Sequence, residues 1–144
     1  MTEYFQYYRE SLYPMQDKIL SILRNCGSPF YLTGETALSR GYYQHRFSDD
    51  LDFFVNGSKT FYSDIEKLLP LIEKDGFVIS KDDNYSSPDF LRLSVANENF
   101  PANRLKIDFV NDVPVHFCDY VDTSVYYKTD SIENILTNKY TALY

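Results

Sequence analysis

Residues 30–54 read FYLTGETALSRGYYQHRFSDDLDFF, and this stretch decides the fold that we predict. A short apolar strand at 30–33 ends at Gly34, and a short helical segment follows it. The segment DDLD at 49–52 then places three carboxylates in four positions, where a second strand, 50–55, begins. Like charges this close repel one another. Their position beside a core strand therefore indicates a site that offsets the repulsion.

Hydrophobic periodicity predicts that strands and helices alternate along the chain. We expect further helices over 2–25, 63–75 and from about 130 to the end, and further strands over 77–80, 90–95, 104–110 and 113–117. Ser63 and Glu66 fit a capping box, and Pro70 is expected to kink or split the helix that follows. Because short polar loops join the later strands, we predict a mixed α+β fold whose partly antiparallel sheet is flanked by helices.

The composition narrows the class of protein. A chain of 144 residues, 44% hydrophobic and 24% charged, suits one domain over 1–144. The formal net charge of −7 argues against a broad basic surface for nucleic acid but not against a local basic cleft. Cys26 and Cys118 lack close spacing and histidine partners, so we expect two buried thiols. No signal peptide or long apolar stretch is present, which predicts a cytoplasmic protein without a membrane span.

The carboxylates of two strands are expected to converge. Side chains alternate along a strand, so Asp50 and Asp52 share one face, with Cα atoms about 6.5 Å apart. Lys106 and Asp108 share a face of 104–110 in the same way. If the two strands are neighbours, three carboxylates meet, and a divalent cation such as Mg²⁺ would offset their repulsion. Alternation of this kind is also typical of any half-exposed antiparallel strand, so D-x-D alone is a weak signal.

Two further residues favour a phosphate site. Gly34 follows a strand and opens a helix, and the backbone N–H groups of such a turn can approach a phosphate. The alternative is an ordinary strand-to-helix turn. Lys139 lies within the apolar stripe of the last helix, so its side chain either reaches solvent past that stripe or faces an anion.

Together these motifs resemble the AbiEii/AbiGii-type nucleotidyltransferase toxins of the DNA polymerase β-like nucleotidyltransferase superfamily. The family pattern GGTAL, then HR-x-S-x-D-[LI]-D-x-F, matches without a gap at Gly34, Thr36, Ala37, Leu38, His45, Arg46, Ser48, Asp50, Leu51, Asp52 and Phe54. A K-[LI]-D strand matches 106–108, and a K-x-x-A pattern matches Lys139 and Ala142. The resemblance runs from about residue 30 to the end and implies a nucleotidyltransferase-like fold.

The resemblance implies transfer of a nucleotide from an NTP to an acceptor hydroxyl, with tRNA favoured and a protein hydroxyl second. Asp50 and Asp52 would hold Mg²⁺, as one ion or two. Asp108 would complete the metal site and help deprotonate the acceptor. Arg46 would pair with these acids, and His45 would be structural. The nucleotide would be bound by the turn and the residues around it: Gly34, Thr36, Ser48, Lys106 and Lys139.

The same resemblance implies the toxin half of a toxin–antitoxin or phage-defence pair, with a cognate antitoxin as partner. The chain departs from the family in two places. Glu35 replaces a second Gly or a Ser, and a carboxylate there repels a triphosphate unless it points away or faces a cation. The family's C-terminal helical region is largely absent after Tyr144, so we expect a piece of a longer protein.

Two alternatives remain open from the sequence. The first is a degenerate, non-catalytic domain that binds a partner, with Glu35 as the damaged position. The second is a glycosyltransferase that uses D-x-D to bind a nucleotide-sugar, although this would leave the Gly34 turn and the Asp108 strand unexplained.

Overall fold

A five-stranded mixed sheet organises the part of the chain that the computed structural model describes, residues 3–43, 48–81, 86–116 and 119–141. The strand order is β1-β2-β5-β4-β3. β2 and β5 are parallel, and the other neighbouring pairs are antiparallel. The strands are β1 (Tyr31–Thr33), β2 (Leu51–Asn56), β3 (Phe77–Lys81), β4 (Phe90–Asn97) and β5 (Phe100–Asp112). The expected mixed, partly antiparallel sheet is confirmed.

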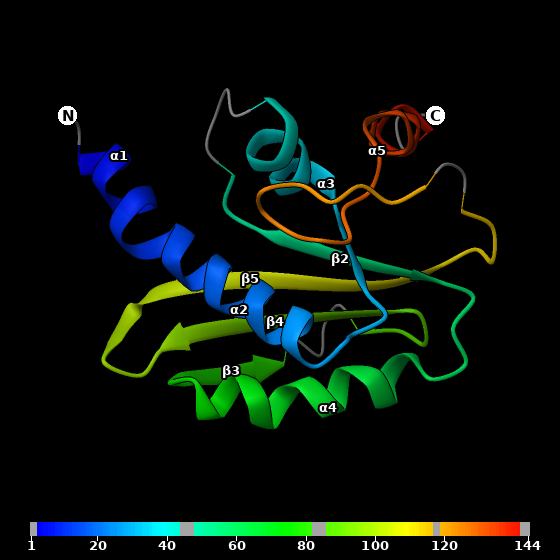
Figure 1. Cartoon of the computed structure of the whole chain (residues 1–144). Helices are drawn as coiled ribbons and strands as arrows, with labels where there is room; N and C mark the ends of the chain where they lie inside the picture. The colour runs from blue at the N-terminus through cyan, green and yellow to red at the C-terminus, as the bar shows by residue number, and fades with distance from the viewer. Residues whose placement is uncertain (1–2, 44–47, 82–85, 117–118, 142–144) are drawn as a thin grey trace.

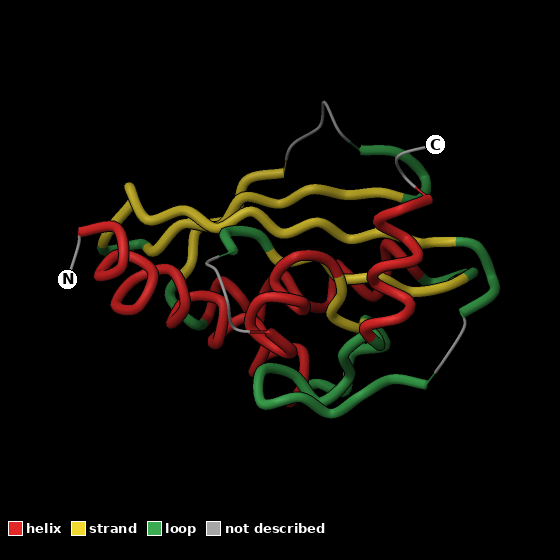
Figure 2. Tube along the Cα trace, turned by 90° about the horizontal axis from the view of Figure 1, so that it is seen from above, coloured by secondary structure: helices red, strands yellow, loops and turns green. Residues whose placement is uncertain are grey.

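Helices cover one face of this sheet. The N-terminal helical stretch consists of α1 (Glu3–Tyr7), the π-helical η1 (Tyr8–Leu12) and α2 (Tyr13–Asn25). After β1 come α3 (Gly34–Thr36) and the π-helical η2 (Ala37–Tyr43), and later α4 (Phe61–Lys74) and α5 (Ile132–Thr141). Figure 1 shows α2 and α4 in front of the strands, and Figure 2 shows α5 crossing the sheet edge toward the opposite side.

The core lies between the sheet and the pair α2 and α4. Alternate strand residues point into it, and they are buried together with the apolar faces of the two helices: Ile19, Leu20, Leu23, Leu51, Phe53, Ile65, Leu68, Ile72, Leu91, Leu93, Val95, Leu105, Ile107 and Phe109. Aromatic rings occupy its centre, where Phe53 stacks on Phe109 at 5.7 Å between ring centroids. Phe30 meets Phe109 edge-on at 5.0 Å. The opposite strand face is consequently free for polar residues.

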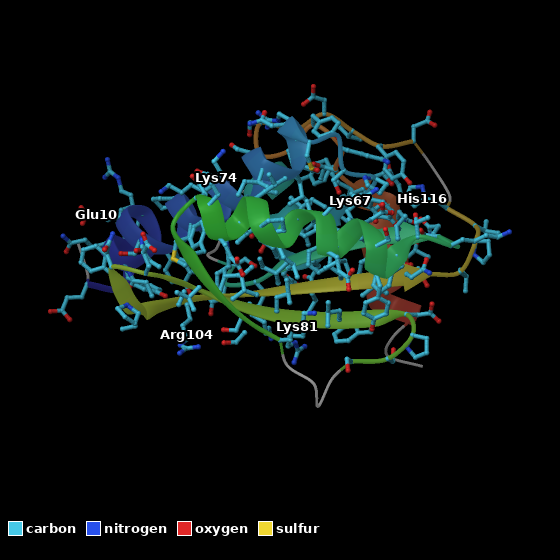
Figure 3. The ribbon with its side chains drawn as sticks, turned by 90° about the horizontal axis from the view of Figure 1, so that it is seen from below. Glu10, Lys67, Lys74, Lys81, Arg104 and His116 are labelled. Atoms are coloured by element: carbon cyan, nitrogen blue, oxygen red, sulfur yellow. The ribbon has the colours of Figure 1, made fainter. Side chains whose placement is uncertain are left out.

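The second face of the sheet is polar where α2 and α4 do not cover it. Asp52, Asp108 and Arg92 lie in one row across β2, β5 and β4, and Lys106 lies two residues before Asp108. In Figure 3, Lys67 and Lys74 mark α4, and Arg104 lies on the other side of the strands. No helix among the described residues is both long enough and apolar enough to cross a membrane.

The α4 helix departs from its expected start and from the expected break at Pro70. It begins at Phe61, and Thr60 precedes it with its hydroxyl 2.7 Å from the Asp64 carboxylate. The predicted capping box at Ser63 is therefore wrong, because Ser63 already lies inside the helix. Pro70 does not split the helix, which continues to Lys74. Pro70 is exposed, so water can satisfy the carbonyl group that lacks its backbone partner.

Two smaller expectations also fail. Residues 113–116 form no strand, because β5 ends at Asp112 and Pro114 follows closely. Cys26 is exposed instead of buried, since it forms the C-terminal cap of α2 at the surface. Cys118 lies outside the described residues.

Replacing Phe109 by alanine should lower the free energy of unfolding by about 3–5 kcal/mol, because it removes a fully buried ring from a packed core. The matched control is Phe100→Ala on the same strand, where the ring is 63% exposed and the expected change is within about 0.5 kcal/mol. Urea unfolding measures both. Similar losses in the two variants would contradict the core described here.

Candidate active site

The two acidic strands are neighbours, which meets the condition under which their carboxylates were expected to converge. In the parallel pairing of β2 with β5, Asp52 is the register partner of Asp108. Asp50 immediately precedes β2 and lies within ion-pair distance of Lys106, whose Nζ is 3.0 Å from Oδ2 of Asp50. The structure thus brings Asp50, Asp52, Asp108 and Lys106 together on one face of the sheet.

The turn after β1 lies against one of these acids. Thr33 is extended, and Gly34 has φ +75°, a left-handed conformation that side chains disfavour. A Cβ atom built at Gly34 would overlap the Asp52 carboxylate and approach its Cγ to 3.0 Å. Glycine is therefore required twice, by the backbone angle and by the close approach. The turn and the acid form one site.

The pKa of Asp52 is raised to about 7. Burial is the main cause, and the charges of Asp108 and Asp50 add to it, while Lys106 and Arg92 act in the opposite direction. Asp52 is thus the carboxylate of the site that resists ionisation, because the fold places it between two acids and away from water.

The outer carboxylates of the site are paired with basic side chains. Arg92 on β4 binds Asp108 with both prongs of its guanidinium group, Nε to Oδ1 at 2.7 Å and Nη2 to Oδ2 at 3.0 Å. Bidentate geometry makes this a strong, directional ion pair. Lys106 pairs with Asp50 in a more exposed position, where both side chains are 40% accessible. Asp108 is consequently held more firmly than Asp50.

A pocket of about 270 Å³ opens beside the turn. Its lining residues come from the turn, β2 and α5: Thr33, Gly34, Glu35, Asp52, Phe54, Ile135 and Asn138. A larger cavity of about 680 Å³ lies between α2 and α4. We place the site at the smaller pocket, because Asp52 and the Gly34 turn both line it.

Two predicted nucleotide-binding residues lie behind the pocket. Thr36 is fully buried and Ser48 nearly so, and their hydroxyl oxygens are 2.7 Å apart. The Thr36 hydroxyl also donates to the backbone carbonyl of Asp50. The hydrogen bonds of Thr36 thus link the helical segment after the turn to the residues that precede β2. His45 and Arg46 lie outside the described residues, as does the side chain of Lys139, whose backbone belongs to α5.

The carboxylates supply only oxygen ligands, a set that suits Mg²⁺ better than a transition metal. Over the described ranges, no three His, Cys, Asp or Glu side chains are placed to share one ion. Mg²⁺ usually takes one or two carboxylates together with water and substrate phosphates. Asp50 and Asp52 fit that smaller requirement, and the three-carboxylate site stays a prediction.

Sequence reasoning missed Arg92 and the α5 side of the pocket. In FLRLSV, alternation places Arg92 opposite the buried Leu91 and Leu93, which could have marked it as a polar-face residue. The alternation does not give the register between β4 and β5, so Asp108 could not be named as its partner. Asn138 carries no comparable signal, because nothing local indicates which helix face meets the turn.

Comparison with known proteins agrees with this geometry. The family model described as nucleotidyl transferase AbiEii toxin, Type IV TA system, matches residues 19–144. The chain belongs to the AbiEii nucleotidyltransferase toxin family. The resemblance seen in the sequence is thereby confirmed. No curated protein sequence matches this AbiEii-family chain significantly.

Solved structures share the fold of this AbiEii-family chain. JHP933 from Helicobacter pylori matches with a TM-score of 0.65 and 23% identity, over 96% of this chain and 57% of its own. A second Helicobacter pylori structure matches with a TM-score of 0.66 and 22% identity, over 96% of this chain and 59% of its own. The chain therefore spans less than two thirds of the length of these relatives.

The raised pKa of Asp52 predicts a pH-dependent stability. An acid with a folded pKa of about 7 and an unfolded pKa of about 3.9 stabilises the fold while protonated. That contribution is present below about pH 4 and is lost as the pH rises through about 7. The stability of Asp52→Asn relative to the wild type should therefore increase from about pH 5 to about pH 8, by on the order of 2 kcal/mol.

Urea unfolding of Asp52→Asn and the wild type at both pH values measures this change. The exposed Asp119→Asn is the control for loss of one carboxylate. A difference between Asp52→Asn and the wild type that is the same at both pH values would show that Asp52 is not perturbed.

Proposed function

We propose that the chain carries the catalytic core of a Mg²⁺-dependent nucleotidyltransferase toxin. The reaction transfers a nucleotide from an NTP to an acceptor hydroxyl, with tRNA the favoured acceptor and a protein hydroxyl the second. The observation that supports this best is the contact between the Gly34 turn and Asp52, beside a pocket and in register with Asp108. A cytoplasmic setting, a cognate antitoxin and a part in phage defence belong to the same proposal.

The turn supplies the binding side of the proposed reaction. With no side chain at Gly34, a phosphate can approach the backbone N–H groups closely. Lys106 lies beside the acids and can neutralise phosphate charge once its pairing with Asp50 is exchanged. Lys139, whose backbone belongs to α5, is proposed to act in the same way.

The acids supply the second part of the proposal. Asp50 and Asp52 would hold Mg²⁺, which when bound neutralises charge that develops on the phosphoryl oxygens. Asp108 would accept the proton of the acceptor hydroxyl, and Arg92 orients its carboxylate for that task. A general base must lie within hydrogen-bond reach of the proton that it abstracts, and pairing with Arg92 holds the Asp108 carboxylate in one orientation.

A second candidate function is binding of a partner by a non-catalytic domain. The observation that favours it is the position of Glu35, which lines the same pocket as Asp52. Two acids in one pocket oppose the entry of a triphosphate. Nucleotide binding by the purified chain therefore decides between the two candidates.

Mixing the chain with Mg²⁺, an α-³²P-labelled NTP and a total tRNA fraction should label the RNA. EDTA and Asp52→Asn should each abolish the label, because both remove the metal-binding part of the site. The control is Asp119→Asn, an exposed carboxylate away from the pocket, which should label RNA as the wild type does.

Mass spectrometry of the chain and its protein partners tests the protein acceptor. No labelled product with any of the four NTPs, together with no Mg²⁺-NTP shift of the unfolding midpoint, would reject catalysis in favour of partner binding.

Neutralising Glu35 should improve nucleotide binding. Glu35→Gln keeps the size of the side chain and removes its charge from the pocket wall. We expect the KM for the NTP to fall about 3- to 10-fold, which corresponds to roughly 0.7–1.4 kcal/mol of relieved repulsion. The matched control is Glu133→Gln at the exposed first turn of α5. An unchanged KM in Glu35→Gln would mean that its carboxylate points away from the bound phosphates.

A further inference from the structure

The Asp130 carboxylate is fully buried next to the pocket, although it is not part of the pocket lining. Its Oδ2 accepts a hydrogen bond from the hydroxyl of Thr33 at 2.9 Å, and the Asn134 Nδ2 donates to both oxygens, at 2.9 Å to Oδ1 and 2.7 Å to Oδ2. His116 Nε2 lies 2.9 Å from its Oδ1, and the backbone N–H of Ser131 donates to the same oxygen at 3.1 Å. We call Asp130, Thr33, His116 and Asn134 the Asp130 cluster.

The backbone around Asp130 also follows the sheet edge. The Asp130 N–H donates to the carbonyl of Leu32 at 2.8 Å, and the Leu32 N–H donates to the carbonyl of Lys128 at 3.0 Å. The Tyr42 hydroxyl donates to the Asp130 carbonyl at 2.5 Å. Residues 128–130 thus run beside β1 and are tied to η2, and α5 begins two residues later.

The Asp130 cluster connects the two groups of residues that line the pocket, those of the Gly34 turn and those of α5. Thr33 is the last residue of β1, directly before Gly34, and it lines one wall. Asn134 lies in the first turn of α5, directly before Ile135 and one turn before Asn138, which line the other wall. Thr33 and Asp130 are 97 positions apart in the sequence. The Asp130 carboxylate therefore links the two groups of lining residues through hydrogen bonds from Thr33 and Asn134, in addition to the backbone hydrogen bonds that join Leu32 to Lys128 and Asp130.

A buried charge makes this connection selective for one geometry. Loss of one donor from a buried carboxylate costs free energy, because the oxygen atom that it served is left with fewer hydrogen bonds and no water replaces the donor. Apolar contacts have no such directional requirement. The cluster consequently adds a directional constraint on the separation between the turn and α5, beside the backbone hydrogen bonds of Leu32 and the packing of Ile135.

We propose that Asp130 is a positioning residue for nucleotide binding, which acts through Thr33 and Asn134 to set the separation between the Gly34 turn and α5. The carboxylate itself has no exposed surface and does not touch the nucleotide. The proposal rests on the proposed nucleotidyltransferase function for its kinetic consequence, and on geometry alone for its structural one.

Thr33→Val removes the side-chain hydrogen bond to Asp130 and keeps the shape of the side chain, while the backbone hydrogen bonds of Leu32 stay in place. Thr129→Val is the matched control. Both threonines are buried, but the Thr129 hydroxyl donates to Tyr126 and contacts Thr123, outside the cluster. Amide hydrogen exchange at residues 37–41 and 135–138, which follow the first turns of the two helical segments, reports how often each segment opens. Steady-state kinetics with an NTP reports KM and kcat separately.

Thr33→Val should accelerate exchange in both segments about tenfold and raise the KM for the NTP by a similar factor, with kcat within about threefold of wild type. Thr33→Ser, which restores the hydroxyl, should return both values to those of the wild type. Thr129→Val should leave both unchanged. This pattern separates positioning from a general loss of stability, which would affect the two valine variants alike.

Wild-type exchange and KM in Thr33→Val would overturn the proposal, and so would equal effects in Thr129→Val. If Thr33→Val does not fold, Asn134→Ala removes the α5 side of the connection and must accelerate exchange at 37–41, or the proposal fails. If the wild type transfers no nucleotide, the proposed function fails, and the exchange data alone decide whether the Asp130 cluster positions the turn.

Discussion

The parallel pairing of β2 with β5 is the constraint on which the rest of the molecule depends. Its register places Leu51 beside Ile107 and Phe53 beside Phe109 on the face that α2 and α4 cover. The same register leaves Asp52 beside Asp108 on the other face. A shift by one residue would exchange the two faces, moving acids into the core and aromatic rings to the surface. The hydrophobic effect therefore fixes the site, because burial of one face determines which acids meet on the other.

The electrostatics of the site follow from that geometry. Bringing carboxylates together beside a buried surface is unfavourable, and the fold limits the penalty with two cations from neighbouring positions, Arg92 and Lys106. Burial raises the pKa of Asp52, and the negative charge that these two cations do not offset raises it further. Binding of a cation or protonation of Asp52 relieves the repulsion. The repulsion between these carboxylates is unfavourable while no cation is bound. A cation that binds there removes this repulsion, so its binding is more favourable than at a lone carboxylate on an open surface.

Local pattern was sufficient to predict most elements of the fold and the face on which each acid lies, whereas the pairing of the two acidic strands was a hypothesis that also used the family resemblance. Alternation along 50–55 and 104–110 is dictated by burial of one face, and the register that satisfies both strands is nearly forced. Partners that depend on strands far apart in the chain were not predictable in this way. Arg92 reaches Asp108 through the β4–β5 register, and Asp130 reaches Thr33 across most of the chain. The α4 start was missed because Thr60 and Ser63 are both competent caps, and packing of Phe61 decides between them.

The contact between Gly34 and Asp52 also constrains how such a protein can change over evolutionary time. Any side chain at position 34 would displace the acid or break the turn, so this position has no neutral alternatives while the site is under selection. Position 35 lies one residue farther along, on the pocket wall, and is free of that overlap. Under the proposed function, changes in nucleotide affinity are expected to accumulate at the second residue of the turn, because substitutions there leave Gly34 and Asp52 in place.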